Sequence, residues 1–336
     1  MYPKLFLVLS LLVLALPARS AEVNVYSGRK EALIRPLLDR FTEQTGIKTR
    51  LVTAKADKLL VRLQNEGRNT PADLLITADA GRLHRAKRAG VLQPVQSELL
   101  NRAVPAHLRD PDGQWYGLSK RARVIFYARD RVKPEELSTY EDLADAKWRQ
   151  RICIRSSGNI YNQSLVASLI IANGEEATEA WARGLVRNMA RPPRGGDRDQ
   201  IKAVAAGQCD LAVANTYYYG KMLTGKDASQ REAARSTGLF WPNQQGRGAH
   251  VNVSGAGVTR HAKNRENAIR LLEFLVSPEA QQWYAEVNFE YPVVEGVPVG
   301  ERVRDWGAFK ADAVDLDRLG ELNPVAVRLM DRAGWR

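Results

Sequence analysis

The sequence predicts an α/β fold of two lobes. The chain has 336 residues, which is more than one hydrophobic core usually supports. Strand-like and helix-like segments alternate from residue 22 onward, in the order strand, helix, strand, helix, strand. This alternation predicts a doubly wound parallel sheet covered by helices.

The first twenty residues are predicted to be a secretory signal peptide rather than part of the fold. Lys4 supplies a positive charge, and residues 5–16 form an apolar run too short to span a bilayer. Ala18 and Ser20 are the small residues expected before a cut that follows Ser20. No later segment is apolar and long enough to span a membrane, so we expect an exported, soluble protein.

The first lobe opens with a regular series of elements. Leu33, Leu37, Leu38 and Phe41 recur at helical spacing, and Gly46 ends that helix. The predicted elements are a strand at 22–27, a helix at 30–45, a strand at 48–53, a helix at 57–66 and a strand at 74–77.

The rest of the chain continues the alternation. Residues 114–127 are predicted to form two strand segments that cross between the lobes, and the stretch after Gly220 lacks a regular pattern. Further strands are predicted at 152–155, 211–214 and 250–259, a short helix within 139–148, and helices at 156–172, 175–188, 199–206, 264–275, from 277 onward and near the C-terminus.

Three consecutive tyrosines follow the predicted strand at 211–214. Asn215 and Thr216 end the strand, and Tyr217, Tyr218 and Tyr219 come next. Open α/β sheets bind ligands at the carboxyl ends of their strands. A phenol titrates near ~10, but a highly charged cation can bind it as phenolate, a hard oxygen donor suited to ferric iron. The alternative is an aromatic cluster that fills a gap under a helix.

Cysteine content and charge narrow the class of protein. Cys153 and Cys209 could form one disulfide in an oxidising compartment, the alternative being two buried thiols. Loss of Lys4 and Arg19 with the signal peptide lowers the formal charge from +12 to +10. Because Lys and Arg are mixed with Asp and Glu along the predicted helices, and because the protein is exported, we expect no nucleic-acid partner.

Several segments together resemble one family, the periplasmic ferric-iron-binding proteins of ABC importers, in its tyrosine-rich branch. The resemblance covers most of the mature chain, with motif order and spacing preserved. The segments are YSGR at 26–29, PADLLITADAGRL at 71–83, RVIFY at 123–127, IRSSGNIYNQSLVASLI at 154–170, GGDRDQI at 195–201, ANTYY at 214–218, HVNVSGAGV at 250–258, and then ENAIRLLEFLVSPEAQ and EYPV.

The resemblance implies a two-lobed periplasmic-binding-protein clamshell, each lobe a mixed sheet flanked by helices, joined by hinge strands. Lobe 1 would comprise residues 21–122 and 247–299, and lobe 2 residues 123–246 and 300–336. The protein would be a periplasmic monomer that closes on Fe(III) and delivers the ion to a permease in the inner membrane.

The resemblance also implies a set of ligands. Tyr217, Tyr218 and Tyr127 would bind the metal, and three phenolates would offset its three charges. Tyr219 has no ligand role in the family pattern. In lobe 1 this chain departs from the family, because Lys30 and Glu31 stand where relatives often carry His or His-Tyr. Glu31 could supply a carboxylate, the alternative being an ordinary acid at a helix start.

An anion such as carbonate, or water, would then complete the coordination. Asp79 is expected to cap a helix rather than to bind metal. Arginines near Tyr127, backbone N–H groups at a helix start and an amide before the tyrosines are suited to hold the anion. These candidates are Arg121, Arg123, Ser156, Ser157, Gly158 and Asn215.

Two other classes of protein remain as alternatives. One is a solute-binding protein for a polyamine, thiamine or an organic anion, whose site would need aromatic walls and charged groups around an organic body. The other is an exported enzyme, but the sequence has no Gly-x-Ser-x-Gly or His-Glu-x-x-His motif. The four histidines also lack close metal-ligand spacing. We therefore expect a binding protein without catalysis.

Overall fold

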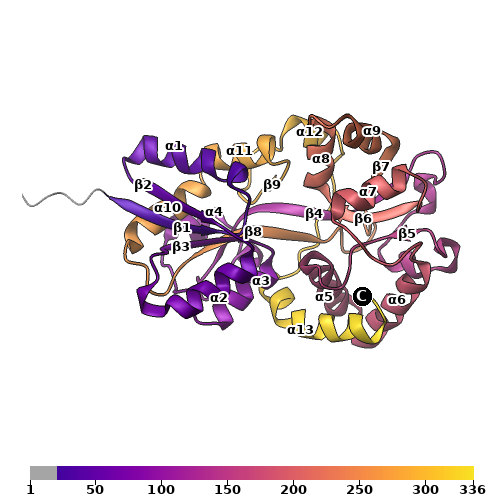
Figure 1. Ribbon diagram of the computed structural model, residues 1–336, viewed down its shortest axis with the longest axis horizontal. Coiled ribbons are helices and arrows are strands. Elements are labelled where there is room, and N and C mark those ends of the chain that lie inside the picture. Colours follow the sequence, from indigo (N-terminus) through magenta and orange to yellow (C-terminus); the bar gives the residue numbers. More distant parts are fainter. Residues whose placement is uncertain (1–20) are drawn as a thin grey trace, which may run out of the picture.

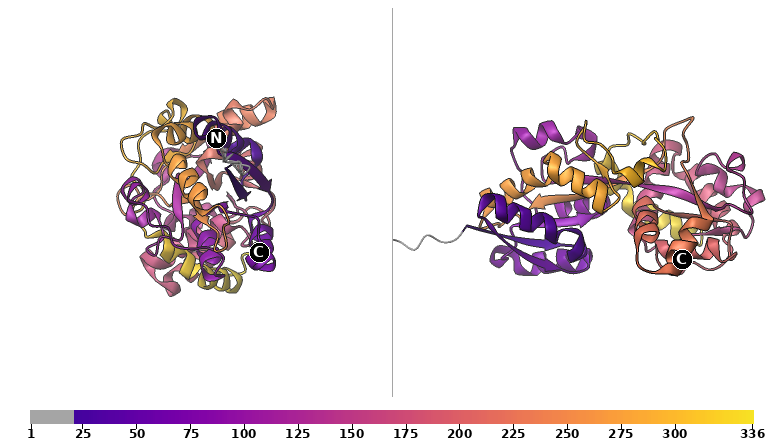
Figure 2. Two further views of the ribbon diagram at one scale, coloured as in Figure 1. Left: turned by 90° about the vertical axis from the view of Figure 1, so that its left-hand side faces the viewer. Right: turned by 90° about the horizontal axis from the view of Figure 1, so that it is seen from above.

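The computed structural model describes residues 21–336 and consists of two lobes joined by long strands (Figures 1 and 2). The predicted signal peptide, residues 1–20, lies outside the described residues. One mixed sheet runs through both lobes in the order β2-β1-β3-β8-β4-β6-β5, with β7 and β9 also paired to β4. Across residues 21–336, every helix is too short or too polar to cross a membrane.

Lobe 1 confirms the predicted opening series. Strand β1 (Glu22–Ser27) lies between β2 (Lys48–Thr53) and β3 (Leu74–Ala78), and both pairings are parallel. The first helix begins later than predicted, because a 3-10 turn ends at Ile34 and Pro36 occupies the first helical turn. The helices of this lobe are α1 (Arg35–Thr45), α2 (Ala56–Glu66), α3 (Ala80–Arg88), α4 (Glu98–Ala103), α10 (Arg265–Leu275) and α11 (Pro278–Val287).

Two long antiparallel strands cross between the lobes, β4 (Tyr116–Ala128) and β8 (Val251–Val258). The predicted pair of segments at 114–127 is therefore one strand, with a register shift near Gly117. Glycine in β8 allows close packing, because a Cβ at Gly257 would lie 2.3 Å from the Gln114 carbonyl oxygen. The second half of β4 pairs with lobe 2, so this strand links the two lobes directly.

Lobe 2 packs its helices around the other end of the sheet (Figure 1). The unpatterned stretch after Gly220 contains regular structure as far as Phe240, comprising the end of one helix, a second helix and a strand. The predicted disulfide between Cys153 and Cys209 is present. The elements are β5 (Ile152–Cys153), α5 (Ile160–Asn173), α6 (Glu175–Asn188), α7 (Asp197–Ala205), β6 (Leu211–Asn215), α8 (Thr216–Thr224), α9 (Ala228–Ser236) and β7 (Thr237–Phe240).

The C-terminal helix α13 (Leu316–Arg332) packs against both lobes (Figure 1). Asp317 lies 2.8 Å from His84 Nδ1 on α3, and Asn323 donates to Gln163 on α5 at 3.0 Å. Residues 300–336 were predicted to belong to lobe 2 alone, whereas α13 contacts helices of both lobes. Strand β9 (Tyr291–Pro292) and helix α12 (Glu301–Arg304) precede it. Short 3-10 turns lie at Glu31–Leu33, Gly67–Asn69, Ala106–Leu108, Pro134–Glu136, Glu141–Ala144 and Ala146–Trp148.

Candidate metal centre

Tyr217 and Tyr218 lie in the first turn of a helix rather than at the end of a strand. Strand β6 ends at Asn215, and α8 begins at Thr216. The helical backbone brings the two neighbouring rings together, with centroids 4.1 Å apart. Tyr219 lies elsewhere, against the rings of Phe126 and Trp306. The run of three tyrosines therefore divides into a pair and a separate packing residue.

A third phenol joins the pair, and it is Tyr161. Its hydroxyl oxygen lies 3.5 Å from that of Tyr217. Tyr161 occupies the first turn of α5, which Asn159 caps by accepting from the Asn162 N–H at 3.3 Å. Sequence reasoning missed Tyr161, although its segment belongs to the family resemblance. The available signal was a phenol directly after the polar stretch that opens a helix.

Tyr127, which the resemblance placed in the site, lies away from this cluster. Antiparallel pairing of β4 and β6 sets Tyr127 opposite Leu211, whereas Arg123 lies opposite Asn215. Four residues of strand separate these positions by roughly 13 Å, at ~3.3 Å per residue. The Tyr127 ring lies against β7, where a Cβ at Gly238 would be 2.1 Å from its Cζ. Strand register thus places Tyr127 apart from the Tyr217–Tyr218 pair, and Tyr161 is the phenol that lies beside the pair.

Arg121 is a predicted anion-binding residue whose charge lies against two of the phenol rings. Its guanidinium carbon is 5.5 Å from the Tyr217 ring centroid and 5.9 Å from that of Tyr161. The side chain is buried and donates to the hydroxyl of Ser254 on β8, which also accepts from Arg29 of lobe 1. Arg121 therefore brings a buried positive charge from the hinge to the phenol cluster.

The predicted anion site at 156–158 has a different geometry from the one expected. Helix α5 starts at Ile160, so Ser156, Ser157 and Gly158 form the preceding loop. The Ser156 carbonyl accepts from Asn162 Nδ2 at 3.1 Å, and the Ser157 carbonyl accepts from Gln163 Nε2 at 2.8 Å. These contacts fix the loop against the helix that carries Tyr161.

The acidic side chains that lobe 1 offers near this region already have protein partners. Glu31 is paired with Arg35 at 2.9 Å, and its side chain is 58% exposed. Arg29 is buried and forms an ion pair with the buried Glu290 at 2.8 Å. Asp79 caps α3 as predicted, accepting from the Gly81 N–H at 2.9 Å. In this structure Glu31 is thus engaged with a neighbour on its own segment.

Burial raises the pKa of Tyr217 and of Tyr218 above the ordinary value of a phenol, and the negative charge that Tyr161 can carry raises both further. The positive charge of Arg121 opposes this shift at Tyr217. Tyr217 and Tyr218 would therefore be neutral phenols near neutral pH without a metal. A cation must therefore displace their protons, which requires a strong Lewis acid.

Other metal-binding groupings are missing from the described part of the chain. Between residues 21 and 336, no three His, Cys, Asp or Glu side chains lie close enough together to hold a metal ion. The oxygen donors that do converge are phenols. This donor set favours a hard trivalent cation over zinc or copper, which prefer nitrogen and sulfur ligands.

A two-lobed fold with a ligand-binding cluster beside its hinge defines a solute-binding protein of the clamshell type. The chain belongs to the bacterial extracellular solute-binding protein family, whose sequence profile matches residues 69–315. It is 53% identical over 320 residues to iron uptake protein A1 of Synechocystis, covering 95% of this chain and 89% of that protein.

Solved structures agree with this assignment. A Trichodesmium protein (IdiA, FutA) in complex with iron and citrate ligands superposes with a TM-score of 0.92 at 52% identity, covering 94% of this chain and 100% of that one. The ferric binding protein from Campylobacter jejuni superposes with a TM-score of 0.89 at 40% identity, covering 94% of this chain and 100% of that one. The predicted clamshell fold is therefore confirmed.

Proposed function

We propose that this chain is the periplasmic solute-binding component of an ABC iron importer. Its cargo is Fe(III), held by the phenolates of Tyr161, Tyr217 and Tyr218 and buried when the two lobes close. The chain then delivers the ion to a permease in the inner membrane. It acts as a monomer, binds no nucleic acid and catalyses no reaction.

The approach of the Tyr161 and Tyr217 hydroxyl oxygens to 3.5 Å is the observation that carries this proposal. Two neighbouring phenols gain little from each other, whereas a trivalent ion bound by these two and by Tyr218 would replace their protons and offset three negative charges. The relatives named above, an iron uptake protein and a ferric binding protein, support the same cargo. The predicted signal peptide supports a periplasmic location.

The charges around the phenols favour an anion as an additional ligand. Three phenolates neutralise Fe(III), yet Arg121 lies over two of the rings and Arg198 lies 6.0 Å from the Tyr218 ring centroid. Glu31, the one carboxylate predicted from lobe 1, is paired with Arg35 instead. A bound anion such as carbonate would occupy open coordination positions and balance the surplus positive charge.

Iron loading of the purified mature chain tests this function. The iron-free protein should gain one Fe(III) per chain and a visible phenolate-to-iron absorption band. Tyr217→Phe should remove most of that band while leaving the unfolding temperature nearly unchanged. A mature wild-type chain that stays colourless with Fe(III), both with and without added bicarbonate, would refute the assignment.

A further inference from the structure

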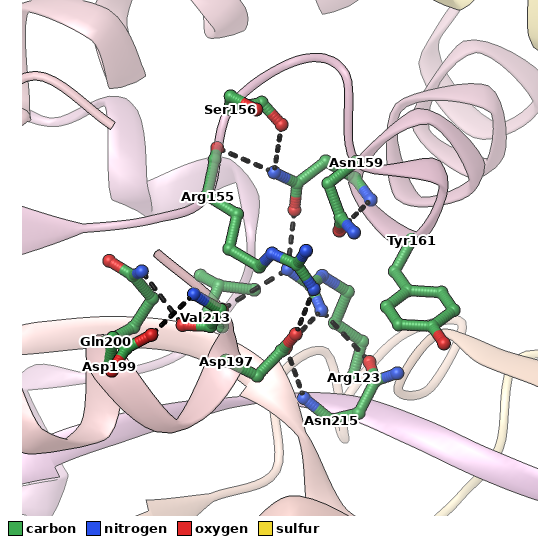
Figure 3. Close-up of polar contacts among 12 residues, drawn as sticks. Arg123, Arg155, Ser156, Asn159, Tyr161, Asp197, Asp199, Gln200, Val213 and Asn215 are labelled. Atoms are coloured by element: carbon green, nitrogen blue, oxygen red, sulfur yellow. Dashed lines mark hydrogen bonds and ion pairs between the residues drawn. The ribbon is translucent and has the colours of Figure 1, made fainter. Parts of the chain in front are cut away.

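Arg123 forms the centre of a buried hydrogen-bond network beside Tyr161 (Figure 3). Its Nη1 donates to Asp197 Oδ1 at 2.9 Å and to Asn215 Oδ1 at 3.0 Å. Its Nη2 donates to Asn162 Oδ1 at 2.5 Å and to the Val213 carbonyl at 3.3 Å. Both terminal nitrogens are thus engaged by protein acceptors, so the anion-binding role expected of Arg123 does not fit its surroundings.

Two of the three side chains that accept from Arg123 stand close in sequence to a phenol of the candidate metal centre. Asn162 directly follows Tyr161, and Asn215 stands two residues before Tyr217. In Figure 3 the Tyr161 ring extends past Arg123 toward Asn215. One guanidinium on the hinge strand β4 therefore ties together the starts of α5 and α8, the two helices that carry the phenols.

Asp197 extends the same network to a third helix. Its Oδ1 also accepts from the Asn215 N–H at 3.1 Å, and its Oδ2 accepts from Arg155 Nη1 at 2.7 Å. Asp197 is the first residue of α7, and the next residue is Arg198, which lies over the Tyr218 ring. The carboxylate therefore orients Arg155 while it offsets the charge of Arg123.

We propose that Arg123 is a positioning residue that assembles the three phenols before iron arrives. This inference rests on the proposed iron-binding function. The phenols come from two helices that start 56 residues apart, and the Cys153–Cys209 disulfide joins the segments that precede these helices rather than the helices themselves. Charge-assisted hydrogen bonds in a buried site are strong and directional, so the Arg123 network holds both helix starts in a geometry that one metal ion can bridge.

The test compares Arg123→Met with Arg247→Met in the mature chain. Arg247 also forms ion pairs within the fold, with Asp312 at 2.7 Å and Glu141 at 3.2 Å. The residue is not among the groups that contact the three phenols. Both variants lose ion pairs within the fold, buried for Arg123 and partly buried for Arg247, so both should unfold more easily, but only Arg123→Met disturbs the phenol-bearing helices.

Three readouts are measured for each variant: Fe(III) affinity by competition with a chelator, the wavelength and intensity of the iron band, and the unfolding temperature of the iron-free chain. Arg123→Met should bind iron about tenfold more weakly or worse, a loss on the order of 1.4 kcal/mol, and its band should shift or weaken. Arg123→Lys keeps the charge but fewer donors, and should recover only part of the affinity. Arg247→Met should keep the wild-type affinity and band.

Asn162→Ala provides a second test if Arg123→Met does not fold. This change frees the start of α5 while Arg123 keeps Asp197 and Asn215, so the band should weaken through Tyr161 alone. Wild-type affinity and band in a folded Arg123→Met or Asn162→Ala chain would overturn the inference. An equal loss of iron affinity in Arg247→Met would also overturn the inference, because it would show that lower stability rather than displaced phenols weakens iron binding. A colourless wild-type chain would instead refute iron binding itself.

Discussion

Tyr161 and Tyr217 come from the first turns of two different helices, and their hydroxyl oxygens lie 3.5 Å apart. This contact defines where a metal ion would bind. It also separates two assignments of the third ligand, because Tyr127 sits at the opposite end of the β4–β6 pairing.

Phenylalanine substitutions at Tyr161 and at Tyr127 should have different effects on iron binding. Tyr161→Phe removes one of three phenolates, so iron affinity should fall by about tenfold or more and the visible band should weaken and shift. Tyr127→Phe removes only a hydroxyl near β7, so affinity and band should match the wild type. Chelator competition and absorption spectra measure both effects. Retained colour in Tyr161→Phe together with loss in Tyr127→Phe would restore the assignment from the sequence.

Local sequence patterns predicted lobe 1 well, because its first strands and helices carry regular apolar spacing. The region after Gly220 was missed for a physical reason. In α9 only Ala233 and Ala234 are buried, so the helix has no apolar stripe to recognise. It forms because α7 and α8 pack against it, and contacts of that kind are not visible in a local pattern.

The sequence predicted only part of the candidate site, because the rest also depends on long-range contacts. Tyr217 and Tyr218 are neighbours in the chain, so their pairing could be anticipated. Their helical conformation was not, since three tyrosines after an apolar run are also typical of a strand. Whether Tyr127 can be the third phenol depends on the register of β4 against β6, which sets Arg123 rather than Tyr127 opposite Asn215. That register is decided by long-range packing.

Iron binding should release protons, since burial raises the pKa of Tyr217 and Tyr218 and keeps both phenols neutral in the iron-free chain. Binding as phenolates releases about three protons per Fe(III), so affinity should fall as the pH is lowered. Tyr161→Phe should release about one proton fewer than the wild type under matched conditions. Titration of both proteins in weakly buffered solution with the same iron complex measures the difference. Equal proton release would show that Tyr161 stays protonated.

Lys221 should make the iron-free chain more stable as the pH rises. Burial lowers its pKa to about 8; Glu290 opposes this shift, and the nearby Arg29, Arg198 and Lys30 add to it. The unfolded chain has an ordinary lysine pKa near ~10.4. Between these two values the unfolded state binds more protons than the folded state, so the free energy of unfolding increases with pH. The charged form of Lys221 correspondingly destabilises the fold below about pH 8.

Lys221→Met should remove this contribution, so it should stabilise the iron-free chain at about pH 7 and flatten its rise in stability toward about pH 10. Urea unfolding at a series of pH values measures the change. Lys202→Met, at an exposed position on α7, is the matched control and should follow the wild-type curve. A Lys221→Met curve parallel to that of the wild type would rule out the predicted titration.

Loss of the disulfide should lower stability without removing the metal centre. Cys153 and Cys209 are buried and close a loop with a sequence separation of 56, for which chain-entropy arguments give about 4 kcal/mol as an upper estimate. The bond anchors β5 to the start of β6, whereas Tyr217 follows the end of β6. The double substitution Cys153→Ala and Cys209→Ala should therefore lower the free energy of unfolding by about 2–4 kcal/mol while the iron-loaded protein keeps its visible band. Urea unfolding and absorption spectra of the same samples test both parts, and a lost band in a chain that remains folded would show that the bond also supports the phenol cluster.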